Sequence, residues 1–217
     1  MKIFDNLQAF IWRHPQTNNC NSYLLRGSKN ILIDPGHRHL FDHVRLGLID
    51  LGLTPEQIDL VIITHGHPDH LEAAGLFKAP ALKTMSLKEA NFIKEYAGRV
   101  GWNGTNELRP DFFLQEGELI IGDLEFQVLI TPGHSPGSLC LYWPKHKALF
   151  TGDLIFSQGI GRTDLPGGDG ALLKESILRT SDLEVEVLLS GHGEIINGRK
   201  AVEANFEMIQ NVWFNYL

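Results

Sequence analysis

Short apolar runs along the chain alternate with stretches whose apolar residues recur at helical spacing. Several of the short runs are apolar throughout, which is typical of strands buried on both faces. This alternation of strands and helices predicts an α/β fold. The predicted strands span residues 22–25, 30–33, 60–63, 118–121, 125–130, 138–143, 148–150 and 185–189. The predicted helices span residues 40–51, 54–57, 71–77, 87–96 and 171–179, with a last helix after residue 198.

Local signals define the ends and faces of some of these elements. Ser86 and Glu89 have the spacing of a capping box, in which each side chain bonds the other residue's backbone at the start of a helix. Residues 98–110 contain three glycines and are predicted to form a long surface loop. The last helix carries an apolar stripe that we expect to face the core. That stripe consists of Val202, Phe206, Ile209 and Trp213.

The composition fits a folded protein with one domain over residues 1–217, since 43% of the residues are hydrophobic and 21% are charged. The net charge of −7 and the lack of Lys and Arg clusters argue against a nucleic-acid partner. No apolar run approaches the ~20 residues of a membrane span. The N-terminus lacks the pattern of a secretion signal, so we expect a cytoplasmic protein without membrane contact. Cys20 and Cys140 lie in apolar surroundings and are predicted to be buried hydrophobes.

Four of the apolar strands run directly into side chains of the kind that bind metals. Loops beyond strand ends are where sites assemble in α/β folds, so these side chains can converge at one edge of the structure. Imidazole suits zinc and iron, and a carboxylate adds charge neutralisation and can bridge two ions. The side chains are His65, His67, Asp69, His70, His134, Asp153 and His192.

The spacing within the first of these segments suits two adjacent ions. His65 and His67 are two residues apart, so in an extended segment they point the same way. Asp69 and His70 follow at a turn into a helix and point elsewhere. The glycines beside the predicted ligands, Gly66, Gly133, Gly152 and Gly191, are expected to let the backbone turn tightly. The remaining histidines are interpreted as ordinary polar residues, and they are His14, His37, His39, His43 and His146.

On these motifs the chain resembles the metallo-β-lactamase superfamily, and the resemblance runs from residues 32–36 (LIDPG) to residues 190–193 (SGHG). It implies a four-layer αββα sandwich with two divalent ions, which are zinc or, alternatively, iron or manganese. It implies that His65, His67 and His134 bind one ion. It also implies that Asp69, His70 and His192 bind the second ion, and that Asp153 bridges both together with a water or hydroxide.

The stretch from Gly161 to Asp164 (GRTD) resembles the short bacterial glyoxalase II-like hydrolases, which are similar to hydroxyacylglutathione hydrolases. This implies a binuclear hydrolase that cleaves S-lactoylglutathione or a related small thioester with a metal-bridging hydroxide. The protein is expected to be either a monomer or a homodimer. The stretch also occurs in the persulfide dioxygenases, which use one iron that His65, His134 and Asp153 could hold. The complete second ligand set favours hydrolysis. A lactonase and a non-catalytic metal-dependent scaffold are further alternatives.

The same resemblance assigns the catalytic role to Asp69, which would orient the nucleophile while it binds metal. The leaving thiolate needs little assistance, because the pKa of a thiol is about 8.5. Asp34, Arg162 and Asp164 are candidates for bracing the ligands by hydrogen bonds. Ordinary hydrogen bonding within loops is the alternative for these three residues.

Full-length glyoxalase II carries a C-terminal helical domain that supplies much of its glutathione contact, whereas 25 residues follow His192 here. From this difference we expect turnover of thioesters with weak discrimination among thiol carriers. The predicted loop over residues 98–110, with Arg99, Trp102 and Arg109, is the candidate for a substitute wall. A flexible surface loop is the alternative.

Overall fold

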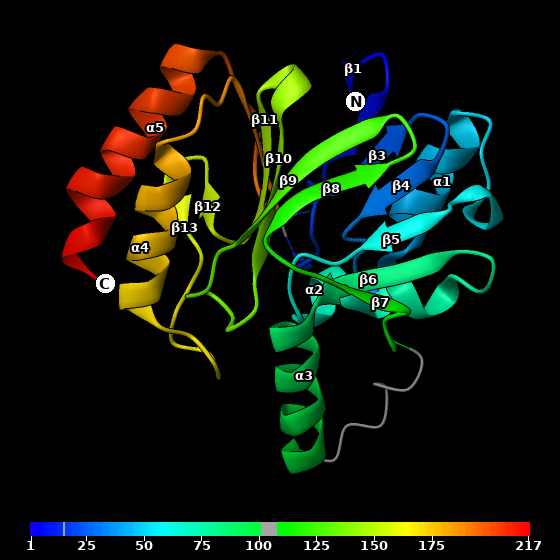
Figure 1. Ribbon diagram of the computed structural model, residues 1–217, viewed down its shortest axis with the longest axis horizontal. Helices are drawn as coiled ribbons and strands as arrows, with labels where there is room; N and C mark the ends of the chain where they lie inside the picture. Colours follow the sequence, from blue (N-terminus) through cyan, green and yellow to red (C-terminus); the bar gives the residue numbers. More distant parts are fainter. Residues whose placement is uncertain (15, 101–107) are drawn as a thin grey trace.

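The computed structural model describes residues 1–14, 16–100 and 108–217 of the chain. Two β-sheets lie face to face, and helices pack on their outer sides (Figure 1). The predicted αββα sandwich is therefore confirmed. No helix in the described segments is long and apolar enough to cross a membrane.

The first sheet contains the N-terminal half of the described strands, and they follow one another in chain order. Its first four strands pair antiparallel, and the pairs from β4 to β7 are parallel. The strands are β1 (Lys2–Phe4), β2 (Leu7–Phe10), β3 (Ser22–Arg26), β4 (Asn30–Ile33), β5 (Leu60–Ile62), β6 (Leu82–Ser86) and β7 (Phe112–Leu114).

The second sheet has the order β15-β14-β11-β10-β9-β8, and only the β11–β14 pair among its described strands is parallel. A short hairpin of β12 and β13 follows β11. The strands are β8 (Gly117–Ile121), β9 (Leu124–Ile130), β10 (Leu139–Trp143), β11 (Ala148–Gly152), β12 (Ile155–Phe156), β13 (Gly159–Ile160), β14 (Val187–Ser190) and β15 (Ile196–Asn197).

Helix α1 covers the first sheet and helices α4 and α5 cover the second, whereas α3 projects beyond the edge of the sheets (Figure 1). The α-helices of the first half are α1 (Asp42–Asp50), α2 (Pro68–Leu71) and α3 (Leu87–Val100), and those of the second half are α4 (Gly170–Ser181) and α5 (Arg199–Val212). The 3-10 segments are η1 (Arg38–Leu40), η2 (Pro55–Gln57), η3 (Glu72–Leu76), η5 (Pro144–His146) and η6 (Trp213–Asn215).

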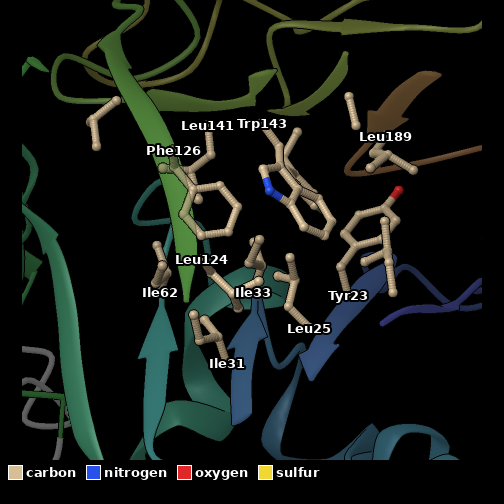
Figure 2. Close-up of a cluster of buried hydrophobic side chains, with 14 of the residues drawn as sticks. Tyr23, Leu25, Ile31, Ile33, Ile62, Leu124, Phe126, Leu141, Trp143 and Leu189 are labelled. Atoms are coloured by element: carbon tan, nitrogen blue, oxygen red, sulfur yellow. The ribbon is translucent and has the colours of Figure 1, made fainter. Parts of the chain in front are cut away.

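Alternating residues of the facing strands fill the space between the sheets, as Figure 2 shows. Trp143 and Phe126 have ring centroids 5.6 Å apart, and Tyr23 meets Phe150 edge to face at 5.3 Å. Burial of this many large apolar side chains, at roughly 1.5–3 kcal/mol each, holds the two sheets in one relative position. The strand ends of one sheet are thereby fixed against those of the other.

The outer layers confirm most of the predicted patterns. In α5, Val202, Phe206 and Ile209 are buried, and Trp213 in η6 packs against the same cluster. Both cysteines are free and buried, and burial raises the pKa of the Cys140 thiol to about 12.

The predicted loop over residues 98–110 is wrong at its start, because α3 continues to Val100 and includes Gly98 and Arg99. A glycine in a helix costs about 1 kcal/mol, and the buried Ala97 shows that tertiary packing holds this turn. Trp102 lies outside the described residues. The predicted helix over 71–77 also begins earlier, at Pro68, and its second part is 3-10.

Candidate metal centre

The ends of strands from both sheets meet at one edge of the sandwich. β5 of the first sheet leads to His65 and His67, and α2 presents Asp69 and His70. β9, β11 and β14 of the second sheet lead to the other predicted ligands. In three overlapping sets the potential ligand atoms lie within 4.8 Å of one another. The sets are His65, His67 and His134; His65, His70 and Asp153; and Asp69, His70 and His192.

The carboxylate of Asp153 lies at the middle of these sets. Its Oδ2 atom is 3.4 Å from His134 Nε2, 3.9 Å from His65 Nε2 and 3.3 Å from His192 Nε2. Its Oδ1 atom is 3.2 Å from His70 Nε2. One buried carboxylate thus contacts imidazoles on both sides of the centre.

The three histidines of the first set, His65, His67 and His134, are held neutral. Burial, together with the neighbouring His70, lowers the pKa of His65 well below its ordinary value. Burial lowers the pKa of His67 to about 4, and it also lowers the pKa of His134. The Nε2 atoms of His65 and His134 are buried and have no hydrogen-bond partner among the described residues. Neutral imidazoles with unpartnered nitrogens that face one another fit a metal ion, since ligation requires that lone pair.

The two histidines of the set with Asp69, His70 and His192, hold positive charge. Burial by itself lowers the pKa of His192, but the carboxylates of Asp153 and Asp69 outweigh it and raise that pKa to about 9. Burial likewise disfavours charge on His70, and Asp153 outweighs it, so its pKa is raised. The two Nε2 atoms of these histidines are 3.3 Å apart. Without a metal, protons on this pair balance the buried carboxylates, and a cation would displace them.

Asp34 braces this side of the centre. Its Oδ2 atom pairs with His70 Nδ1 at 2.8 Å and accepts a hydrogen bond from Thr64 Oγ1 at 2.7 Å. Its Oδ1 atom accepts from the Thr64 amide at 2.8 Å. These bonds orient the His70 ring so that Nε2 points to Asp153, as a carboxylate behind a metal-binding histidine commonly does.

Unlike the Asp34 side chain, the side chains of Arg162 and Asp164 do not brace a predicted ligand. They are exposed and pair with each other, at 2.6 Å between Arg162 Nη2 and Asp164 Oδ2. The contact with the centre comes from the backbone, because the Arg162 carbonyl accepts from His134 Nδ1 at 2.8 Å. That bond directs His134 Nε2 inward.

Two asparagines that the sequence analysis missed also hold the centre. Asn18 donates to Asp69 Oδ2 at 2.6 Å. Asn21 donates to the carbonyls of Ser190 and Gly193, at 3.0 and 2.9 Å, and so holds the loop of His192. Both asparagines lie in a segment of the chain without hydrophobic periodicity, so only their contacts reveal them.

Glu89 was predicted to close a capping box, and this is only half correct. Its amide donates the expected bond to Ser86 Oγ at 3.1 Å. Its carboxylate, which is fully buried, turns inward and accepts bonds from the Gly66 amide at 2.7 Å, the Gly137 amide at 2.7 Å and Ser135 Oγ at 2.5 Å. It therefore ties the loop of His65 and His67 to the loop of His134. The sequence held one signal, because Glu89 shares a helix face with the buried Ile93 and Ala97 at spacings of four.

Gly152 and Gly191 were both expected to allow a tight turn, but glycine is needed at the two positions for different physical reasons. Gly152 adopts φ +47°, in the left-handed region that favours glycine. Gly191 does not have a positive φ, but a Cβ there would collide with the Asp153 carboxylate and the His70 ring. Space beside the ligands, rather than backbone freedom, requires glycine at position 191.

Comparisons with known proteins agree with this geometry. The family profile described as metallo-beta-lactamase superfamily matches residues 16–192. A probable metallo-hydrolase of Methanocaldococcus jannaschii is 35% identical over 192 residues, which are 81% of this chain and 88% of that protein. Hydroxyacylglutathione hydrolase GloC of Haemophilus influenzae is 35% identical over 175 residues, which are 75% and 79% of the two chains. The crystal structure of TTHA1623 in a di-iron-bound form has a TM-score of 0.68 and 28% identity and covers 88% of this chain and 92% of that one.

Replacing Glu89 by glutamine should loosen the two histidine loops together. The amide has one oxygen where the carboxylate uses two, so at least one buried donor loses its partner, at a cost of about 1–3 kcal/mol. We expect chemical denaturation of the Glu89→Gln protein to show a lower free energy of unfolding by that amount. Metal affinity should fall as well, by about 10–100-fold in competition with a chelator. Glu95→Gln, at an exposed site on the same helix, is the control. Equal stability and affinity in both variants would contradict the bracing role of Glu89.

Proposed function

This chain belongs to the metallo-β-lactamase superfamily, which makes it a metal-dependent hydrolase, and we propose that it hydrolyses thioesters by means of two divalent ions. The observation that carries the proposal is the position of Asp153 between two sets of ligand-type side chains. A single-ion site needs only one such set. The similarity to a hydroxyacylglutathione hydrolase supports a thioester as substrate.

In this proposal His65, His67 and His134 hold one ion, and Asp69, His70 and His192 hold the other. Asp153 is shared by both. The unpartnered Nε2 atoms of His65 and His134 support the first assignment, and the charge balance at His70 and His192 supports the second. Imidazole and carboxylate donors suit zinc and also iron. We propose zinc, with iron as the alternative because the relative TTHA1623 binds two irons.

The residues around the centre suit attack by water on a carbonyl. Divalent ions in these sets would polarise the carbonyl oxygen and make water acidic enough to attack at neutral pH. Asp69 lines the cleft of about 480 Å³ above the centre, and the bond from Asn18 fixes its carboxylate there. In that position Asp69 can orient the attacking water and accept its proton. The thiolate then leaves unaided, because a thiol pKa of about 8.5 makes it a good leaving group.

The shape of the cleft supports a substrate that lies across its mouth. Phe156 and Ile160 of the β12–β13 hairpin form one wall, and Arg162 and Leu165 continue it. The Phe156 ring lies 5.7 Å from that of His192, edge to face. Of these four wall residues, Arg162 is the charged one.

The protein purified without chelator and then saturated with zinc should hold about two ions per chain, because each ligand set is complete. His192→Ala should lower that number towards one, since the set of His65, His67 and His134 stays intact. Mass spectrometry of the native protein and elemental analysis measure the number directly. His14→Ala, at an exposed histidine outside the ligand sets, is the control. Saturation of the unmodified protein at one ion, with oxygen uptake on glutathione persulfide, would support an iron dioxygenase instead.

Asp153→Asn should weaken both sites at once, because the shared carboxylate balances charge between two cations about 3.5–4 Å apart. We expect hydrolysis to fall by more than about 100-fold, with a far-ultraviolet circular dichroism spectrum like that of the unmodified protein. Asp182→Asn changes an exposed carboxylate in the same way and should leave hydrolysis unchanged. An Asp153→Asn protein that retains full activity and two ions would exclude the shared role.

The zinc-loaded protein should hydrolyse S-lactoylglutathione, and the protein stripped of metal should not. Esters of coenzyme A and of a simple thiol should be hydrolysed at comparable rates, because the walls of the cleft offer Arg162 as the charged group for recognising a carrier. Steady-state kinetics on the three esters measures this. A preference for the glutathione ester above ~100-fold, equivalent to about 2.7 kcal/mol, would contradict weak discrimination and indicate a dedicated carrier site. Absence of turnover on all three esters would reject thioester hydrolysis.

A further inference from the structure

A second pocket, of about 340 Å³, opens beside the metal centre. It lies between α3 and the loop that follows the β12–β13 hairpin, and its walls are mainly apolar. Its principal lining residues are His67, Phe92, Ile93, Tyr96, Leu165 and Pro166. This volume lies at the small end of the range for ligand sites, roughly 300–1,000 Å³.

The walls of this pocket are held by packing. Phe92 and Tyr96, one helical turn apart in α3, stack with centroids 6.1 Å apart and planes at 23°. Ile93 beside them is buried in the outer core of the first sheet. Gly167, with φ +87°, lies so close to Phe92 that a Cβ there would approach the ring within 2.7 Å. The loop carrying Leu165 and Pro166 is therefore seated against α3.

The pocket and the cleft over the metal centre adjoin each other. His67, Pro68 and Leu165 line both. A substrate whose carbonyl lies over the centre can therefore place one substituent past His67 in the pocket and the other towards Arg162. The two sides of a thioester, acyl chain and thiol carrier, diverge from the carbonyl in this way.

The charge and polarity of the pocket walls determine which side of a thioester, the acyl chain or the thiol carrier, fits there. Glu72 is the charged residue that lines it, and no Lys or Arg does so among the described residues. Glu72 is paired with His37 at 2.8 Å. The carboxylates of glutathione or the phosphates of coenzyme A would meet this acid without a compensating cation, which is costly in an apolar pocket. An apolar chain or ring gains from the same walls.

We infer that this pocket binds the acyl group of the substrate and that the protein prefers thioesters with apolar acyl chains of medium length or aromatic acyl groups. The inference rests on the proposed thioester hydrolysis and specifies its substrate class. The thiol carrier extends from the other side of the cleft. Phe92 and Tyr96 are specificity-determining residues in this arrangement.

The test uses zinc-loaded protein and acetyl, butyryl and hexanoyl esters of one small neutral thiol, N-acetylcysteamine, so that only the acyl group varies. We expect kcat/KM to rise about fourfold for each methylene that the pocket buries. A flat profile, with all three esters hydrolysed, would overturn the assignment of the pocket and leave thioester hydrolysis standing.

Variants locate the effect within the molecule. Phe92→Ala and Tyr96→Ala should each lower the ratio of kcat/KM for the hexanoyl ester to that for the acetyl ester by about tenfold. Tyr216→Ala, which removes an aromatic ring that is 79% exposed and does not line the pocket, should keep the ratio. Tyr96 is 40% exposed, so its variant still tests the inference if Phe92→Ala fails to fold. An unchanged ratio in Tyr96→Ala and in a folded Phe92→Ala protein would overturn the inference.

A separate measurement distinguishes failure of the inference from failure of the proposed function. Ketone analogues, in which a methylene replaces the ester sulfur, bind without reacting and are titrated calorimetrically. We expect the hexanoyl analogue to bind more tightly than the acetyl analogue by at least about tenfold, even if no thioester is hydrolysed. Equal affinities for the two analogues would overturn the pocket assignment, whereas absence of hydrolysis alone would reject only the proposed activity.

Discussion

The buried carboxylate of Asp153 needs positive charge around it, and much of the structure near the centre follows from that requirement. It is 8% exposed and lies within 4 Å of the Nε2 atoms of four imidazoles. An isolated charge in such a position is unstable, so it must be met by protons or metal ions. The raised pKa values of His70 and His192 show how the chain meets this need without a metal. The unpartnered nitrogens of His65 and His134 remain available for a cation.

Holding so many polar groups together requires rigid supports that come from distant parts of the chain. Asp34 at the end of β4 orients His70, and Glu89 in α3 joins the loops that carry His65, His67 and His134. Each carboxylate accepts bonds from backbone amides as well as from side chains, so it fixes loops rather than single rotamers. The apolar core between the sheets supplies the frame on which these loops meet.

The surroundings of the centre divide its mouth into two chemically different sides. The side towards α3 is lined by aromatic and aliphatic groups, and the other side carries Arg162 paired with Asp164. A centre that activates water, as proposed here, can act on many acyl compounds, so these walls would decide which substrate places its carbonyl correctly. Selectivity would then arise from α3 and from residues 165–167, and reactivity would arise from the side chains at the strand ends. This separation is consistent with a superfamily that keeps one centre and varies the loops around it.

The sequence by itself determined the layered α/β fold, the principal strands and the grouping of seven ligand-type side chains, because these depend on hydrophobic periodicity and on spacing within short segments. Periodicity did not reveal strands β1, β6 and β7, whose runs are short and partly exposed. The inward turn of Glu89, the bond from Asn18 to Asp69, and the backbone rather than side-chain contact of Arg162 were decided by the tertiary structure. Their partners lie 23 to 51 residues away along the chain, so no local pattern encodes them. The packing of the two sheets brings these groups within bonding distance, and a buried polar group then takes whichever partner that packing supplies.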